Sequence, residues 1–201
     1  MSSGGETFEE IVSNARLLRQ KGETKKAILQ FQRALQIRPD AVDVMNELGL
    51  AHIHIGEQSE ALIVFDTALE IKPDDENAHL NKAEAFLSIG SYEEALKTAE
   101  AGLNHVPTSA GLYSKKGRAL ESLMKIQDAI DAFNESLKYD SENPETWKTI
   151  ALCLDAQAKW AEVARAYRIA ATLHRKRGEM RDAESCTKFA EMAENSVDEM
   201  A

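Results

Sequence analysis

Small, aromatic and turn-forming residues recur along this chain with a period of 34 residues. One register holds the alanines Ala27, Ala61, Ala95 and Ala129, and another holds the aromatic residues Phe31, Phe65, Phe133 and Tyr167. Two further registers hold the glycines Gly22, Gly56 and Gly90 and the prolines Pro39, Pro73 and Pro107. Agreement of several registers over several periods indicates a tandem array of one structural unit.

Within one period, the pattern predicts two helices joined by a short turn. In residues 42–75, Met45, Leu48 and His52 have helical spacing, and Gly56 is placed to end that helix in the left-handed conformation. A second apolar stripe then runs through Ala61 and Phe65 until a proline ends it. Asp40, Asp74, Thr108 and Asn143 are placed to cap the helices that follow. Because one helical pair cannot bury its apolar face alone, we expect successive pairs to stack.

These residues resemble the tetratricopeptide repeat (TPR) family. The second repeat matches its pattern best, through Leu48, Gly49, Gly56, Ala61, Phe65, Ala68 and Pro73. The resemblance covers about 170 residues and weakens toward the C-terminus, where the fourth and fifth repeats lose the glycine and the proline. It implies an all-α, right-handed α-solenoid of five helix-turn-helix repeats, at residues 8–41, 42–75, 76–109, 110–143 and 144–177.

The two ends of the chain fall outside these five repeats. Residues 1–7 are expected to be an N-terminal tail. Residues 178–201 carry a helical stripe formed by Ala183, Cys186, Ala190, Ala193 and Val197, which predicts a C-terminal capping helix followed by a short tail. The alternative is a degenerate sixth repeat that shares the long helix near 161–177, because residues 177–183 imitate the turn of a repeat.

The resemblance also implies where a partner would bind, since the first helix of each repeat lines a concave groove in this family. The residues predicted to line it are Asn46, Leu50, Ile53, Asn77, Leu80, Asn81, Glu84, Leu87, Lys115 and Arg118. The leucines and the isoleucine form an apolar patch beside three asparagines, whose amides both donate to and accept from a peptide backbone. We therefore expect a protein or peptide partner that places an apolar anchor in the groove. The alternative is that some of these side chains pack between neighbouring helices.

Two other kinds of interaction bear on this expectation. The carboxylate clamp by which some family members hold the acidic C-terminal tail of a chaperone is not expected, because Glu47 and Glu84 stand near positions where the clamp needs cations and amides. Self-association through the C-terminal helix or the weakly matching last repeats is an alternative function, which would give a homo-oligomer.

The composition of the chain argues against several other classes of protein. A net charge of −10 disfavours nucleic acid, and no apolar run approaches the roughly 20 residues needed to cross a membrane. The seven bases within 159–181 are followed by an acidic helix, which is expected to neutralise them in part.

Catalysis and cofactor binding are not expected. His52 and His54 point to different sides of their helix, His52 and His79 hold core positions, and Cys153 and Cys186 are expected to act as small apolar residues. The sequence therefore predicts a cytoplasmic, non-enzymatic interaction protein without a metal or cofactor.

Overall fold

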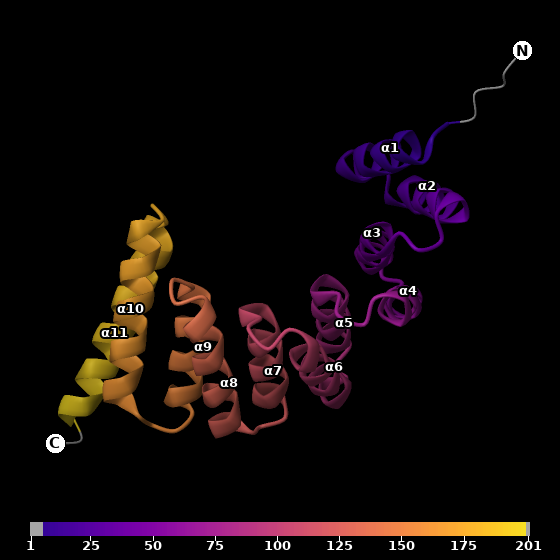
Figure 1. The fold of residues 1–201 in the computed structure, drawn as a ribbon. Coiled ribbons are helices and arrows are strands. Elements are labelled where there is room, and N and C mark those ends of the chain that lie inside the picture. Colours follow the sequence, from indigo (N-terminus) through magenta and orange to yellow (C-terminus); the bar gives the residue numbers. More distant parts are fainter. Residues whose placement is uncertain (1–5, 200–201) are drawn as a thin grey trace, which may run out of the picture. The chain divides into compact units, whose positions relative to one another are not determined.

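The computed structural model describes residues 6–199, with side chains described to residue 197. Every regular element in this range is an α-helix, so the prediction of an all-α chain is confirmed (Figure 1). In chain order the helices are α1 (Phe8–Gln20), α2 (Thr24–Ile37), α3 (Val42–His54), α4 (Gln58–Ile71), α5 (Glu76–Ser88), α6 (Tyr92–His105), α7 (Ala110–Ser122), α8 (Ile126–Tyr139), α9 (Pro144–Asp155), α10 (Trp160–Lys176) and α11 (Met180–Glu199). The predicted tail falls largely on residues 1–5, which lie outside the described residues.

The chain divides into two compact parts between Pro107 and Thr108. The N-terminal subdomain contains α1–α6 and the C-terminal subdomain contains α7–α11. Within each subdomain, every helix packs against its neighbours in the chain, and in the N-terminal subdomain α3 also contacts α5. This arrangement is the one expected of stacked helical pairs, in which each pair covers the apolar face of the next.

The turn inside each helical pair has one geometry throughout the described residues. Gly22, Gly56 and Gly90 adopt positive φ angles of 78°, 83° and 76°. After Gly56, the Glu57 amide donates to the His52 carbonyl at 2.9 Å, which satisfies a carbonyl at the end of α3. The predicted role of these glycines as helix terminators is therefore confirmed.

The predicted helix caps are one residue too early in two cases. Asp75 and Ser109 accept hydrogen bonds from the amides of Ala78 and Leu112 and cap α5 and α7, where the sequence favoured Asp74 and Thr108. Ala41, instead of Asp40, precedes α3 and makes no side-chain cap. Asn143 caps α9 as predicted, with Pro144 at its first turn. Ala41, Asp75, Ser109 and Asn143 are spaced by 34 residues, so the N-cap holds one repeat position, which lies one residue after Asp40, Asp74 and Thr108.

Glycine at the middle of α3 allows a buried aromatic ring to approach the helix. A Cβ atom added to Gly49 would lie 2.4 Å from Cε1 of Phe65, a ring that is fully buried on α4. The same arrangement recurs in the C-terminal subdomain, where a Cβ on Gly117 of α7 would lie 2.6 Å from Cε1 of Phe133 on α8. The small residues of the repeat are thus required by close helix packing.

Helix α10 is longer than the second helices of the other repeats and packs against both α9 and α11. Ala183, Cys186, Ala190 and Ala193 of α11 are buried, as the apolar stripe predicted, but Val197 at its end is exposed. The turn between α10 and α11 also contains a glycine with positive φ, Gly178 at 77°. The last two helices therefore share the turn geometry of the preceding pairs.

Candidate partner-binding groove

The predicted groove residues of the second and third repeats lie on α3 and α5, two helices that contact each other. Leu50 on α3 is 41% exposed, and Leu80 on α5 is half-buried. Ile53 packs against the buried cluster formed by Ala61, Phe65 and Ala85, and Leu87 is buried. Leu50 is therefore exposed, Ile53 and Leu80 are both half-buried, and Leu87 is buried.

The asparagines of the groove are also in different environments. Asn77 is exposed and Asn81 is half-buried. Asn46 is buried, and its Nδ2 donates to Oδ1 of Asp75 at 2.9 Å. Its own Oδ1 has no hydrogen-bond partner among the described residues. Asn46 thus ties α3 to the start of α5 and leaves one acceptor unused.

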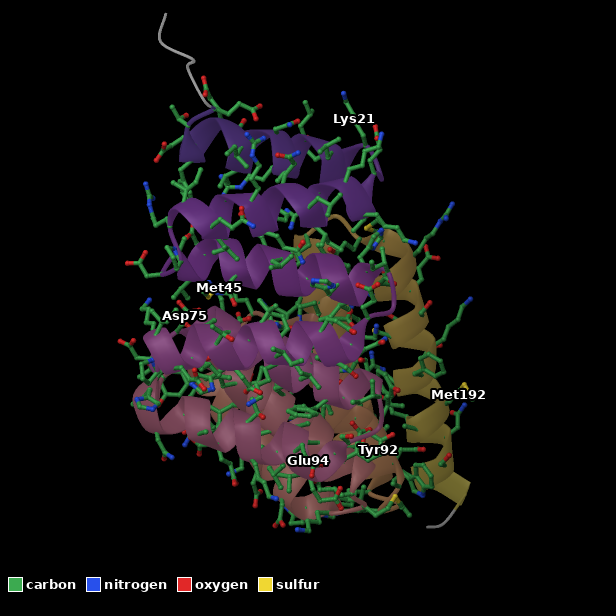
Figure 2. The ribbon with its side chains drawn as sticks, turned by 90° about the vertical axis from the view of Figure 1, so that its right-hand side faces the viewer. Lys21, Met45, Asp75, Tyr92, Glu94 and Met192 are labelled. Atoms are coloured by element: carbon green, nitrogen blue, oxygen red, sulfur yellow. The ribbon has the colours of Figure 1, made fainter. Side chains whose placement is uncertain are left out.

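Asp75 is the centre of a small polar network at the N-terminal ends of α3 and α5. It accepts hydrogen bonds from the Ala78 amide at 2.9 Å, from Asn46, and from Nζ of Lys72 at 3.1 Å. Burial raises the pKa of this carboxyl group, but the three hydrogen bonds outweigh it and lower the pKa overall. Figure 2 labels Asp75 and Met45 at the edge of the N-terminal subdomain where these helices begin.

A cavity of about 450 Å³ opens beside this network. Its lining includes Asn46, Asp75 and Asn77 together with Asp43 and Ile71. It offers two amides, carboxylates, the cations of Arg38 and Lys72, and an apolar side chain in one place. This composition suits a peptide backbone next to an apolar side chain.

Three further residues were predicted to line the groove. Glu84 is half-buried on α5. Lys115 and Arg118 lie on α7, in the C-terminal subdomain. Within the N-terminal subdomain, the predicted groove residues lie on α3 and α5.

Sequence reasoning did not identify an ion-pair network beside this groove. Oε1 of Glu47 on α3 accepts from Nη2 of Arg16 at 2.6 Å, and Oε2 lies 3.3 Å from Nη2 of Arg19, both on α1. These pairs link successive first helices and neutralise Glu47. Their positions were visible in the sequence as opposite charges at groove positions of neighbouring repeats.

The histidines His52 and His79 and both cysteines are buried in the helical core. His52 and His79 are buried, as predicted, and His79 stacks on His105 with ring centroids 6.1 Å apart. Both cysteines are free and buried. Burial raises the pKa of Cys153 to about 11, so its thiol stays protonated at neutral pH and is a poor nucleophile.

The basic segment is partly neutralised, as expected from its sequence. Arg168 on α10 makes a two-point ion pair with Glu194 on α11, at 2.7 and 2.6 Å. Lys176 pairs with Glu142, and Arg175 donates to the hydroxyl of Thr187 at 2.7 Å. Several of these cations are therefore already held by neighbouring groups.

A second cavity, of about 630 Å³, lies between α10 and α11. Ile169, Leu173 and Val197 give it an apolar lining, and Arg165 and Arg168 stand among its polar residues. On α11, Phe189 and Met192 are 49% and 63% exposed. The C-terminal helices thus present apolar surface that was not part of the predicted groove.

Over the described residues, none of the helices combines the length and apolar character needed to cross a membrane. Comparison with curated protein sequences finds no significant match.

Three solved structures with similar folds are distant from this chain in sequence. The crystal structure of MamA protein superposes with a TM-score of 0.72 at 19% identity, over 87% of this chain and 96% of MamA. TTC0263, a thermophilic TPR protein from Thermus thermophilus, gives 0.71 at 18% identity, over 90% of this chain and 98% of that one. YrrB, described as a TPR protein with an unusual peptide-binding site, gives 0.66 at 13% identity, over 89% and 91%. These similarities indicate a helical solenoid.

The sequence itself identifies the family. Two family models, both described as tetratricopeptide repeat, match residues 13–76 and 59–118, and together they span residues 13–118. The matched region includes α3 and α5, which carry most of the predicted groove residues. The chain belongs to the tetratricopeptide-repeat family.

Proposed function

We propose that this protein is an interaction scaffold that binds a segment of a protein partner in the groove between α3 and α5. The fold supports protein–protein interaction in general. The observation that carries the specific proposal is the exposed side chain of Leu50, which lies on a helix in contact with the one that bears Asn77 and Leu80. Together, apolar side chains and amides that can bond a peptide backbone suit a peptide segment with an apolar anchor.

The unused acceptor of Asn46 supports the same proposal. Buried polar atoms normally have hydrogen-bond partners, so an unused oxygen beside a cavity favours a ligand that brings a donor. A peptide backbone supplies N–H groups at regular spacing. YrrB, a structural neighbour, is itself described as having an unusual peptide-binding site. The network at Asp75 would hold Asn46 in place before the partner arrives, which limits the entropy lost on binding.

The test compares partner capture by wild type, by a Leu50→Asp/Leu80→Asp variant, and by a matched Ile63→Asp control. Ile63 is 66% exposed on α4, outside the predicted groove, so its change adds a charge without touching the groove. Proteins captured from the source cells are identified by mass spectrometry, and circular dichroism checks the helical content of each variant.

We expect a partner that wild type and Ile63→Asp retain and the groove variant loses. With that partner purified, its Kd for the groove variant should rise by at least about 30-fold, because a residue at the centre of an interface contributes about 2 kcal/mol or more. Equal binding to all three proteins would place the interaction elsewhere.

Self-association through the C-terminal helices is a second candidate, favoured by the exposed Phe189 and Met192 on α11. Apolar surface of this kind on the last helix of a solenoid is suited to docking on another copy. Mass measured in solution over a concentration series tests it. A mass that rises with concentration in wild type, and stays that of a monomer in Phe189→Glu/Met192→Glu, supports this function, and a constant monomer mass contradicts it.

We further propose that the protein acts as a non-catalytic adaptor in the cytoplasm. Two free, buried cysteines are typical of a reducing compartment.

A further inference from the structure

His174, at the end of α10, lies between carboxylates from two other segments. The His174 residue is only 2% exposed to solvent. Nδ1 lies 2.6 Å from Oε2 of Glu179, and Nε2 lies 3.6 Å from Oε1 of Glu145 on α9. Asp182, on the first turn of α11, completes the group: one ligand atom from each of His174, Glu179 and Asp182 lies within 4.8 Å of the other two.

The ring of His174 cannot satisfy both neighbours with one proton. A neutral imidazole has one N–H donor and one lone pair. If the proton is on Nδ1, toward Glu179, the lone pair of Nε2 faces the carboxylate of Glu145. The ring therefore has one buried nitrogen, Nε2, without a hydrogen-bond partner among the described residues.

A similar contact elsewhere in the chain serves as an internal comparison. His52 at the end of α3 makes the same contact, with Nδ1 2.7 Å from Oε2 of Glu57, after an equivalent glycine turn. No third ligand-type residue clusters with this pair in the described part of the chain. The contact alone thus acts as a tie across the turn, and Asp182 together with the unpartnered Nε2 distinguishes the C-terminal site.

We propose that His174, Glu179 and Asp182 bind a divalent transition-metal ion, for which zinc is the test case. Imidazole nitrogen and carboxylate oxygen are ordinary zinc ligands, and three protein ligands with a water in the fourth position form a common site. Glu179 and Asp182 are exposed, so an ion has access from solvent. No metal site was expected from the sequence.

Metal binding at Nδ1 would also satisfy the other side of the ring. The proton then resides on Nε2 and points toward Glu145, the kind of outer partner that orients a metal-binding histidine. Lys148 holds Glu145 through contacts of 3.0 and 3.2 Å, so this carboxylate is positioned to accept the proton and is not required as a ligand. The ion would join the end of α10 to the start of α11.

The experiment is a calorimetric titration of the full chain, stripped with EDTA, with zinc chloride. The variants are Asp182→Asn, His174→Gln and a matched His52→Gln control. We expect wild type and His52→Gln to bind one equivalent of zinc, and the other two variants to bind at least tenfold more weakly. The thermal midpoint should rise with zinc only in the two proteins that bind it.

Two results would overturn the proposal: wild type binds no zinc, or Asp182→Asn and His174→Gln bind it as wild type does. The second result would indicate surface carboxylates or other histidines as the binding groups. If burial of His174 prevents His174→Gln from folding, which circular dichroism would show, the exposed Asp182→Asn decides alone. The groove on α3 and α5 is not involved, so this test is independent of the proposed partner binding.

Discussion

Two side chains occupy a backbone conformation that favours glycine. Met124 and Ala158 have φ angles of 60° and 55° in the turns after α7 and α9, where other repeats have glycine. The Lys125 amide still donates to the Leu120 carbonyl at 2.9 Å, as in the glycine turns. The packing of the helices on both sides therefore imposes the turn, and the side chain must adopt it at a local cost.

Replacing Met124 by glycine is accordingly expected to stabilise the protein. The left-handed conformation costs a residue with a Cβ atom about 1–2 kcal/mol, and glycine avoids this cost. The greater conformational freedom of glycine in the unfolded chain offsets part of that stabilisation. We expect the free energy of unfolding to rise by about 0.5–1 kcal/mol in urea titrations. Met124 is exposed, so little packing is lost. Lys97→Gly is the control, because Lys97 is exposed in the interior of α6 and glycine there should destabilise the helix; stabilisation by both changes would contradict the argument.

Asp75 links pH to stability at the groove. Its pKa is lowered in the folded protein, so the unfolded chain binds the proton more readily, and stability from this group is present above about pH 4 and lost as the pH falls further. Asp75→Asn keeps the shape of the cap and removes the charge. We expect it to lose about 1 kcal/mol at pH 7 and to show a shallower dependence of unfolding free energy on pH below about 5. Equal slopes for both proteins in urea titrations at several pH values would contradict this account.

At the scale of the helical pair, close contact between a glycine and an aromatic ring sets the packing. Gly49 to alanine would ordinarily strengthen a helix by about 1 kcal/mol. Here the added methyl group would overlap the buried ring of Phe65, and overpacking costs about 1–3 kcal/mol. We expect a net loss of about 1 kcal/mol by chemical denaturation. In a Phe65→Leu background the same change should cost less, and an equal cost in both backgrounds would show that the ring is not responsible.

The sequence predicted these pairs well because each depends on local signals. Gly56 and Phe65 report a turn and a packing position within one repeat, and the structure confirms both. The caps at Asp75 and Ser109 were missed by one residue, because a shift along a short connection leaves the repeat pattern unchanged. The network of Asn46 and Asp75 was missed for a different reason: it joins α3 to the start of α5, and its contacts depend on how the second repeat meets the third.

The predicted groove also shows that a sequence pattern does not reveal contacts between repeats. The repeat pattern places Leu50 and Leu87 on equivalent surfaces, yet Leu50 is exposed and Leu87 is buried. Which residues of a stripe remain accessible depends on the approach of neighbouring helices, and this approach is a tertiary property. The use of each residue in binding remains a prediction that the partner experiment tests.

At the scale of the whole molecule, stability is distributed over neighbouring contacts. Apart from α3 with α5, the substantial contacts in the described residues join helices that follow one another in the chain. Each subdomain has its own buried aromatic residues, with Phe31 and Phe65 before Pro107 and Phe133 after it. In such a chain, a defect should weaken its own stack most and lose effect with distance along the sequence.

Hydrogen exchange on two matched variants tests this independence. Phe133→Ala removes a buried ring from the C-terminal subdomain and should lower the protection of amides in α7–α9 by about 3–5 kcal/mol, while amides in α1–α4 keep theirs. Phe65→Ala should give the reverse pattern, with the loss concentrated in α3–α5. The two substitutions remove the same ring from equivalent positions of two repeats, so the loss should follow the position of the ring. Uniform loss across all helices in both variants would mean that the chain unfolds as one cooperative unit, and the separation of the two subdomains would then carry no consequence for stability.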